Sequence, residues 1–370
     1  MNHMVNGNKG SNLLGNGHSQ THIPELSLEQ RLQNSVVPRK SFEVYDEREE
    51  IPITCAPEVI EIAQNYLAKA GVDTRATGDT GLWDIFWAHE MAAAKITIVF
   101  RGINYQKFLP GRNLAYELLA DAIASLFNGK NGDSIKGKKV AELGGGSGMG
   151  LVFLAQNGAL VTNVDSSVMA LQFSQYLAER AGPHSVGYML NVVKEDFYHT
   201  HFENDKFDAV YNAGVFEHLD DSQAKRLLNE MIRITKPGGY VVISIPNERS
   251  PFYRTMQNKE RSVYKRFKNT FVRLPWEERR RPVNFRGLME GSDLSFVTQD
   301  GLLIPPSQEV RTRDILPQDK QTFLKYLSPD PYQSVDGIIA NWRGFQGSTV
   351  PEFRLRYGMS LYAVGVKKTG

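Results

Sequence analysis

Short apolar runs alternate with stretches of helical periodicity through the centre of the chain. Each run has the length of a strand, whereas the stretches between the runs repeat apolar residues every three or four positions and end near Gly or Pro. Strand, helix and strand repeated in this order predict a doubly wound, parallel sheet of the α/β class. The predicted strands end near Glu142, Val164, Tyr211 and Asn247, and the predicted helices span Met149–Gln156, Ser167–Ala181 and Asp221–Ile234.

Helical segments also precede this alternating core. Apolar residues recur at helical spacing from about residue 57 and again over Leu114–Phe127, with several aromatic residues between them. Residues 1–35 are rich in Asn, Gly, Ser and His, and they hold too few apolar residues to offset the entropy lost on ordering. We therefore expect a flexible tail over 1–35 and an N-terminal helical region over 36–130.

The end of the chain alternates between apolar and polar positions. Glu352–Tyr357 and Ser360–Val366 both show this pattern and are separated by two residues, so we expect them to form an antiparallel hairpin. This hairpin, assigned to 351–370, leaves residues 248–350 as a large insertion after a core that spans 131–247.

Positive charge is concentrated in the first part of this insertion. Between Arg249 and Arg286, twelve Arg and Lys stand against three Glu, although the formal net charge of the whole chain is only +2. Apolar residues recur at helical spacing among these cations. Three interpretations fit: a solvated helix, a basic helix at a membrane surface, or an anion-binding lid. Such a lid would receive a substrate with a phosphate, diphosphate or carboxylate, or an acidic carrier protein.

Composition adds constraints on compartment and chemistry. The chain is 41% hydrophobic and 23% charged, it has no apolar run of eighteen residues, and its N-terminus lacks the apolar core of a secretory signal. We therefore expect a cytoplasmic protein, for which membrane contact is the less favoured interpretation. Cys55 is the only cysteine, so no intrachain disulfide can form, and the eight histidines show no metal-ligand spacing. No metal site is expected.

A glycine-rich segment follows the first predicted strand. Residues 138–150 read KKVAELGGGSGMG, and a dinucleotide-binding loop that starts at Gly144 and Gly146 would need glycine where the chain has Met149. The spacing that includes Gly148 instead makes a tight turn, whose backbone can lie against a ligand without phosphates. The loop therefore favours a nucleoside ligand and argues against a nicotinamide-dependent oxidoreductase.

An acidic residue ends the second predicted strand. Asp165 follows Leu160–Val164 and comes seventeen residues after Gly148, a position from which a carboxylate can accept hydrogen bonds from both ribose hydroxyls. The alternative is that Asp165 caps the helix that begins near Ser166 and Ser167. We favour ribose binding.

Together with three later segments, these motifs resemble the class I S-adenosylmethionine-dependent methyltransferases, in the broad branch that acts on small molecules. Glu195-Asp196-Phe197 is similar to the acidic position after the third strand, Asn212–Leu219 to the loop after the fourth, and Lys236–Asn247 to the turn into the fifth. The resemblance covers Gly137 to Asn247, under a third of the chain. It implies a Rossmann-like, mostly parallel seven-stranded sheet closed by the C-terminal hairpin, with the N-terminal helices as a cap.

The resemblance also implies where S-adenosylmethionine would bind. Gly145 departs from the pattern, because many relatives carry a larger residue there, which leaves open what keeps this loop rigid. The implied contacts are Glu142, Gly144, Gly146 and Gly148 for the methionine part, Asp165 with Ser166 for the ribose, Asp196 with Phe197 for the adenine, and Asn212 with Ala213 for the floor beneath the methyl group.

The function that the resemblance implies is methyl transfer to a small-molecule acceptor, in which an anionic group would match the basic insertion. The sulfonium donor is already activated, so the protein chiefly aligns the acceptor, which contributes about 7 to 11 kcal/mol in favourable cases. A hydroxyl or acidic carbon would also need a base. His218 is the leading candidate, with Glu217 in reserve. The alternative is that His218 anchors the following helix.

Other functions stay open at this point. RNA or protein methylation is compatible with the basic stretch, although Asn212–Val215 lacks the Asn/Asp-Pro-Pro-aromatic motif of enzymes that methylate exocyclic amino groups of bases, and DNA is not an expected partner. A non-catalytic protein that binds the cofactor as a scaffold is a further alternative, which the intact set of motifs disfavours. A homo-oligomer is compatible with the aromatic N-terminal helices.

Overall fold

The computed structural model describes residues 57–72, 81, 83–92, 110–128, 134–181, 190–251, 253–254, 284–303, 316–319 and 343–369. The predictions for the tail over 1–35, for Cys55 and for most of the basic stretch lie outside these residues. Within the described ranges, no helix is long and apolar enough to cross a membrane, and no cluster of His, Cys, Asp and Glu could hold a metal ion.

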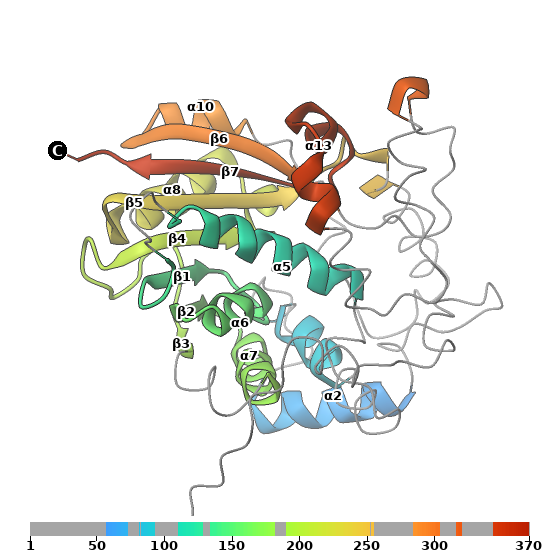
Figure 1. Cartoon of the computed structure of the whole chain (residues 1–370). Helices are drawn as coiled ribbons and strands as arrows, with labels where there is room; N and C mark the ends of the chain where they lie inside the picture. The colour runs from blue at the N-terminus through green and yellow to red at the C-terminus, as the bar shows by residue number, and fades with distance from the viewer. Residues whose placement is uncertain are drawn as a thin grey trace, which may run out of the picture.

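The described strands form one seven-stranded sheet in the order β3-β2-β1-β4-β5-β7-β6 (Figure 1). The first five strands run parallel to one another, and β7 runs antiparallel to both β5 and β6. This confirms the predicted doubly wound, mostly parallel sheet with an antiparallel C-terminal pair. The strands are β1 (Lys139–Leu143), β2 (Leu160–Asp165), β3 (Leu190–Lys194), β4 (Phe207–Ala213), β5 (Thr235–Pro246), β6 (Leu294–Leu302) and β7 (Ser360–Lys367).

Helices cover both faces of the sheet, because the strands bury apolar side chains on both sides. In Figure 1, α5, α6 and α7 lie in front of the sheet and α8 lies behind it. The N-terminal helix α2 and the helical residues 83–92 join the cluster on the front face. The helices are α2 (Pro57–Lys69), α5 (Pro110–Ser125), α6 (Met149–Gln156), α7 (Val168–Arg180), α8 (Asp221–Ile234), α10 (Phe285–Glu290) and α13 (Pro351–Tyr357), with 3₁₀ turns η3 (Phe216–His218) and η6 (Pro317–Asp319).

Local signals explain why the core helices begin where the sequence predicts. The side chain of Asp220 accepts a hydrogen bond from the Gln223 amide at 2.8 Å, and the Gln223 side chain accepts one from the Asp220 amide at 3.0 Å. This capping box satisfies two amides that would otherwise be unpaired at the start of α8 and contributes about 1 kcal/mol. The helix then buries Leu227 and Met231 against the rear face of the sheet.

The C-terminal pair differs from the prediction in its first strand. Residues 352–357 are not a strand: they lie in α13, which has Pro351 at its first position and buries Phe353 and Tyr357. The partner of β7 is β6, which lies within the predicted insertion 248–350 and is separated from β7 by a long stretch of chain. The predicted hairpin over 351–370 is therefore wrong in its boundaries: Phe353, Leu355 and Tyr357 alternate with polar residues as in a strand, but the segment folds as a helix that buries Phe353 and Tyr357.

Candidate cofactor-binding site

The glycine loop follows β1 at the point where the strand order reverses, since β1 lies between β2 and β4. Gly144, Gly146 and Gly148 have φ angles of 69°, 53° and 63°, in the left-handed region that only glycine adopts without strain. The amide of Gly144 donates to the carbonyl of Val164 at 2.7 Å, which ties the loop to the end of β2. Ligands of open α/β sheets bind at such a reversal, beyond the carboxyl ends of the strands.

Asp165 lies beside this loop, and only 9% of its surface is exposed. Its Oδ2 accepts a hydrogen bond from the Gly146 amide at 2.9 Å, and its Oδ1 accepts one from the Ser167 amide at 2.8 Å. Burial raises the pKa of Asp165 to about 6, although these amides act in the opposite direction. Each oxygen keeps a lone pair that can accept a further hydrogen bond from a ligand hydroxyl.

The residue that caps α7 is Ser167 rather than Asp165. The Oγ of Ser167 accepts a hydrogen bond from the Ala170 amide at 3.0 Å, in the normal geometry of an N-cap. Asp165 instead holds the turn before the helix through the Ser167 amide. Ser166 lies between them and is half-buried. Helix capping therefore does not account for the acid at the end of β2.

Glu142 lies beneath the loop and is 1% exposed. The hydroxyl of Tyr211, on the neighbouring strand β4, donates to Glu142 Oε2 at 2.7 Å. Burial raises the pKa of Glu142 to about 8, opposed by this hydrogen bond and reinforced by the negative charge of Asp165. The carboxyl group is therefore mostly protonated at neutral pH, and it lies on the side of the sheet covered by α6.

Phe197 and Asp196 follow β3. Phe197 is half-buried, and a Cβ atom on Gly144 would lie 3.5 Å from its Cε1, so its ring reaches the glycine loop. Asp196 is exposed, and its Oδ1 accepts a hydrogen bond from the Tyr198 amide at 2.9 Å. The ring thus forms part of the wall of the site, while the acid lies at its rim.

The end of β4 and the loop after it form the opposite wall. Asn212 is fully buried and donates a hydrogen bond from Nδ2 to the carbonyl of Leu143, while its Oδ1 has no hydrogen-bond partner among the described residues. A Cβ atom on Gly144 would lie 2.8 Å from the side chain of Val215. Ala213, between them, is half-buried. The structure therefore brings the loops after β1, β3 and β4 together around Gly144.

The candidate base lies in the 3₁₀ turn η3, close to this wall. The His218 side chain is 17% exposed, and its Nε2 lies 3.8 Å from Oε1 of Glu217, which is 3% exposed. The capping box of Asp220 and Gln223 starts α8, so His218 does not cap that helix. His218 also packs edge-on against Trp83, with ring centroids 5.8 Å apart.

Helical residues 83–92 carry side chains that the sequence interpretation did not assign to the site. Asp84 Oδ1 accepts hydrogen bonds from Ser167 Oγ at 2.6 Å and from the Met169 amide at 3.0 Å. A Cβ atom on Gly146 would lie 2.3 Å from the indole of Trp87. Trp83, Asp84 and Trp87 therefore contact the loops after β4, β2 and β1 respectively. Only the fold brings these residues to the motifs, which begin more than fifty positions later in the chain.

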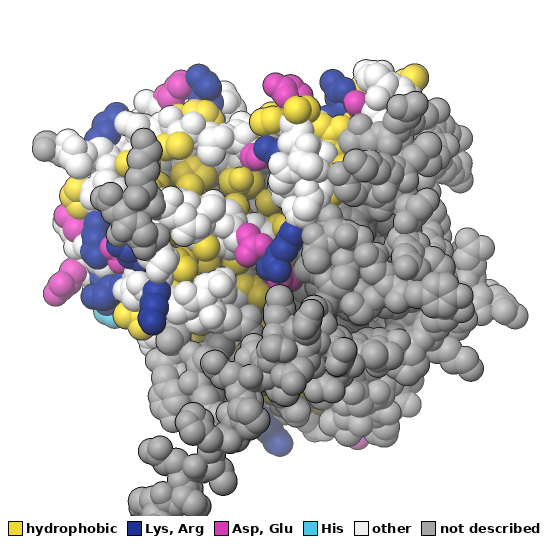
Figure 2. Space-filling view, viewed as in Figure 1, with side chains coloured by type: hydrophobic (Ala, Val, Ile, Leu, Met, Phe, Trp, Pro, Cys, Tyr) yellow, Lys and Arg dark blue, Asp and Glu magenta, His cyan; other side chains and the backbone are white. Residues whose placement is uncertain are grey.

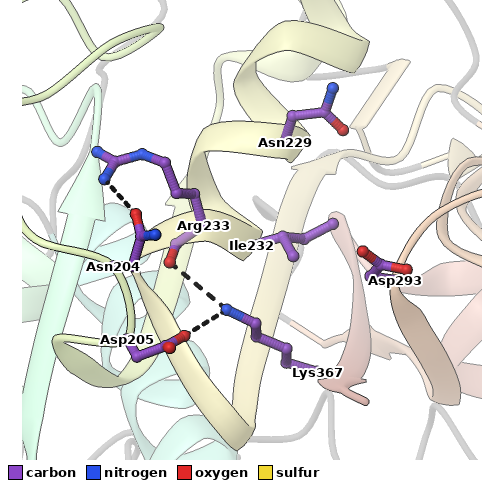
Figure 3. A pocket seen from close by; sticks show the side chains of 7 residues that line it. All are labelled: Asn204, Asp205, Asn229, Ile232, Arg233, Asp293 and Lys367. Atoms are coloured by element: carbon purple, nitrogen blue, oxygen red, sulfur yellow. Dashed lines mark hydrogen bonds and ion pairs between the residues drawn. The ribbon is translucent and has the colours of Figure 1, made fainter. Parts of the chain in front are cut away.

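A hollow at the opposite edge of the sheet is a poorer candidate. Figure 3 shows that it is lined by residues that directly precede β4 and β6, by residues of α8 and by the last residue of β7. Lys367 pairs there with Asp205, and Arg233 donates to Asn204 at 2.9 Å, so these charged groups are already satisfied within the protein. Over the described surface in Figure 2, acidic and basic side chains are interspersed rather than gathered by sign.

Comparison with known proteins supports the sequence interpretation of this core. Residues 141–243 match the family model described as a methyltransferase domain. The ubiquinone biosynthesis O-methyltransferase of Klebsiella pneumoniae is 32% identical over 111 residues, which are 30% of this chain and 43% of that protein. The enzyme of the same name from Thiobacillus denitrificans is 33% identical over 119 residues, 32% of this chain and 49% of that protein. The chain thus spans less than half the length of these relatives.

Solved structures give more distant likenesses. Magnesium protoporphyrin IX methyltransferase from Synechocystis, with S-adenosylhomocysteine bound, is 13% identical with a TM-score of 0.42, over 84% of this chain and 100% of that one. A methyltransferase complex with the Haloferax volcanii activator Trm112 gives 16% identity and a TM-score of 0.43, over 78% and 98%. The family match, the glycine loop and the strand order together make the core of this chain similar to the class I S-adenosylmethionine-dependent methyltransferases.

Proposed function

We propose that this protein transfers a methyl group from S-adenosylmethionine to a small-molecule acceptor. The observation that carries the proposal is the junction of Asp165 with the glycine loop, where the Gly146 amide and the acid meet at 2.9 Å beyond the carboxyl ends of β1 and β2. This arrangement offers a carboxylate to the ribose and an open backbone to the methionine part. The match of residues 141–243 to a methyltransferase domain supports the same cofactor.

The remaining site residues take roles that follow from their positions. Gly144, Gly146 and Gly148 would carry the methionine part, and Ser166 would lie next to the ribose. Phe197 would pack against the adenine with Asp196 at its outer edge. Asn212 and Ala213 would lie under the methyl group, where the unpartnered Oδ1 of Asn212 is an acceptor available to the cofactor ammonium. Glu142 would lie beneath the loop on the side of the methionine part, and its protonation state would set the charge there.

The acceptor group that we favour is a hydroxyl. The relatives with the matching core are named as O-methyltransferases. His218 would remove the hydroxyl proton, and Glu217, 3.8 Å from its Nε2, would stabilise the imidazolium that forms. Trp83 would give one apolar wall beside the base. An anionic substituent on the acceptor remains a prediction from the basic stretch between Arg249 and Arg286.

Cofactor binding is tested by calorimetric titration of S-adenosylhomocysteine into the wild type and Asp165→Ala. Losing the acceptor of two ribose hydrogen bonds should weaken binding by at least about 100-fold, since hydrogen bonds to charged groups contribute about 1.5–3 kcal/mol each. Asp293→Ala is the matched control, because Asp293 is exposed and precedes β6 at the other edge of the sheet. Equal affinities for the wild type and Asp165→Ala would remove Asp165 from the site.

Catalysis is tested with methyl-labelled S-adenosylmethionine and a panel of catechol, 4-hydroxybenzoate, benzoate and aniline. Label should enter a hydroxyl compound, and His218→Ala should lower kcat by about 10²-fold or more while S-adenosylhomocysteine affinity stays within twofold. His201→Ala is the control, because the His201 side chain is 61% exposed. Label found only in aniline or benzoate would contradict a hydroxyl acceptor, and full turnover by His218→Ala would exclude it as the base.

A further inference from the structure

Asn163 lies in β2 directly beneath the glycine loop and is fully buried. Its Nδ2 donates to the carbonyl of Gly146 at 3.0 Å and to Ser174 Oγ, on α7, at 3.1 Å. Asp165 lies two residues further along the same strand, and hence on the same face, and accepts from the Gly146 amide. Both polar groups of Gly146 are therefore held by side chains of one strand.

Gly145 marks the place where Asn163 and the loop compete for space. A Cβ atom on Gly145 would lie 2.3 Å from Asn163 Oδ1 and 2.9 Å from Cγ of Glu142, closer than real Cβ atoms approach other atoms. Gly145 is not among the glycines with positive φ, so its backbone conformation does not require glycine. The requirement is steric, and Asn163 is its main source.

The same contact brings the Glu142 carboxyl group close to the buried amide oxygen of Asn163. Asn163 Oδ1 has no hydrogen-bond partner within the described ranges, and a buried unpaired acceptor normally costs about 1–3 kcal/mol. The Glu142 carboxyl carbon lies 3.0 Å from the same Gly145 Cβ position. A protonated carboxyl can donate a hydrogen bond, and burial raises the pKa of Glu142 to about 8, which makes this proton available at neutral pH.

We infer that Asn163 is the positioning residue of the cofactor loop. From β2 it supplies the packing and hydrogen bonding that fix Gly146, and Gly145 is glycine because Asn163 occupies the space of a side chain there. The inference rests on the proposed function, because the loop is expected to carry the methionine part of S-adenosylmethionine. It answers what keeps a loop with three consecutive glycines in one shape.

The test is a double-mutant cycle of Gly145→Ala, Asn163→Ala and their combination, with S-adenosylhomocysteine affinity and melting temperature measured for each. Each single variant should bind about tenfold more weakly, whereas adding Gly145→Ala to Asn163→Ala should change affinity less than twofold, because the closest clash, with Asn163 Oδ1, is gone and the Glu142 side chain need shift only slightly. Gly347→Ala is the matched control, since nothing lies within 4 Å of a Cβ atom there. Should Gly145→Ala alone fail to fold, folding of the combined variant would support the same contact.

Three outcomes would overturn the inference. Effects that multiply across the cycle would show that Gly145 and Asn163 act independently. Wild-type affinity in Gly145→Ala would show that the space is not needed. A lower melting temperature for Asn163→Ala with unchanged affinity would reduce Asn163 to a structural role. If the wild type itself does not bind S-adenosylhomocysteine, the proposed function fails, and the melting temperatures of the cycle still decide whether the two residues interact.

Discussion

Acids at the two edges of the sheet are held by different kinds of donor. At the carboxyl edge, backbone amides donate to Asp165 and the Tyr211 hydroxyl donates to Glu142. These neutral donors do not offset burial, so the pKa values of Asp165 and Glu142 are raised to about 6 and about 8. In the folded protein, burial therefore makes the ionised forms of these two acids less stable than they are in water.

At the amino edge, the acids pair with cations. Glu230 lies 2.7 Å from Arg233, and Asp208 lies 2.7 Å from Lys236. Burial is the largest single influence on these two acids and acts to raise their pKa values. The hydrogen bonds from Arg233 and Thr200 to Glu230, and those from Lys236 and the Lys139 amide to Asp208, outweigh it only together with the attraction of the cations, and both pKa values are lowered. Acids of the same types thus have lowered pKa values at one edge and raised pKa values at the other, and perturbed pKa values of the second kind are typical of functional sites.

The largest expected effect that separates the two edges is on stability. Glu230→Ala should lower the free energy of unfolding by about 3 kcal/mol, since it leaves Arg233 and Thr200 without their buried acceptor. Urea unfolding measures this loss, with the exposed Glu290→Ala as control. S-adenosylhomocysteine affinity of the folded variant should stay within twofold of wild type. A tenfold loss of affinity would show that the two edges are coupled.

A smaller effect is expected from the pH dependence of stability at the carboxyl edge. The pKa of Glu142 is raised in the folded state from 4.5 to about 8, so its contribution is complete below pH 4.5 and is lost as pH rises through 8. Between pH 6 and pH 9, the wild type should lose on the order of 2 kcal/mol relative to Glu142→Gln. The measurement is the free energy of unfolding at each pH.

Glu203→Gln is the control for this comparison, because Glu203 is exposed. Parallel pH profiles for wild type and Glu142→Gln would mean that Glu142 is already ionised at neutral pH. That result would place a charged rather than a neutral group under the loop and would remove the contrast between the two edges.

The smallest effect is expected at the Asp208–Lys236 pair. The pKa of Asp208 is lowered in the folded state, so its contribution is present above the ordinary pKa of an Asp and is lost as pH falls through the folded value. Asp208→Asn should cost less than about 1 kcal/mol at pH 7, because the Lys236 side chain is 41% exposed and screened by water. The cost should shrink further in 1 M NaCl. A larger, salt-independent cost would indicate that the Lys139 amide, which also donates to Asp208, dominates.

Local patterns predicted the parallel core well. The bounds of α6 and α8 follow from Gly158 and from the capping box at Asp220, both of which lie within a few residues of the helices they limit. The positive φ angles of the glycine loop were likewise implied by glycine itself. Motif spacing was sufficient to place Asp165 next to the loop, because parallel strands end at one edge of a sheet.

Prediction failed where local pattern was ambiguous. The segment that includes Phe353 and Tyr357 fits both a strand and a helix, and the packing of α13 on β6 decided between them. A Cβ atom on Gly301, in β6, would lie 1.9 Å from the Arg354 carbonyl, and Asp300 pairs with Arg354 at 2.6 Å. These contacts join residues more than fifty positions apart, which no local window contains.

By itself, the sequence determined the order of strands and helices, the turn that needs glycine and the acid that ends β2, because each depends on residues close together in the chain. Only the tertiary structure decided that Asn163 and Trp87 contact Gly146. The contact of Asp84 with the turn after β2 and the burial of Glu142 against Tyr211 were likewise decided only by the fold. The pKa values of the acids belong to this second group. They depend on burial and on donors from other strands, which exist only once the sheet has formed.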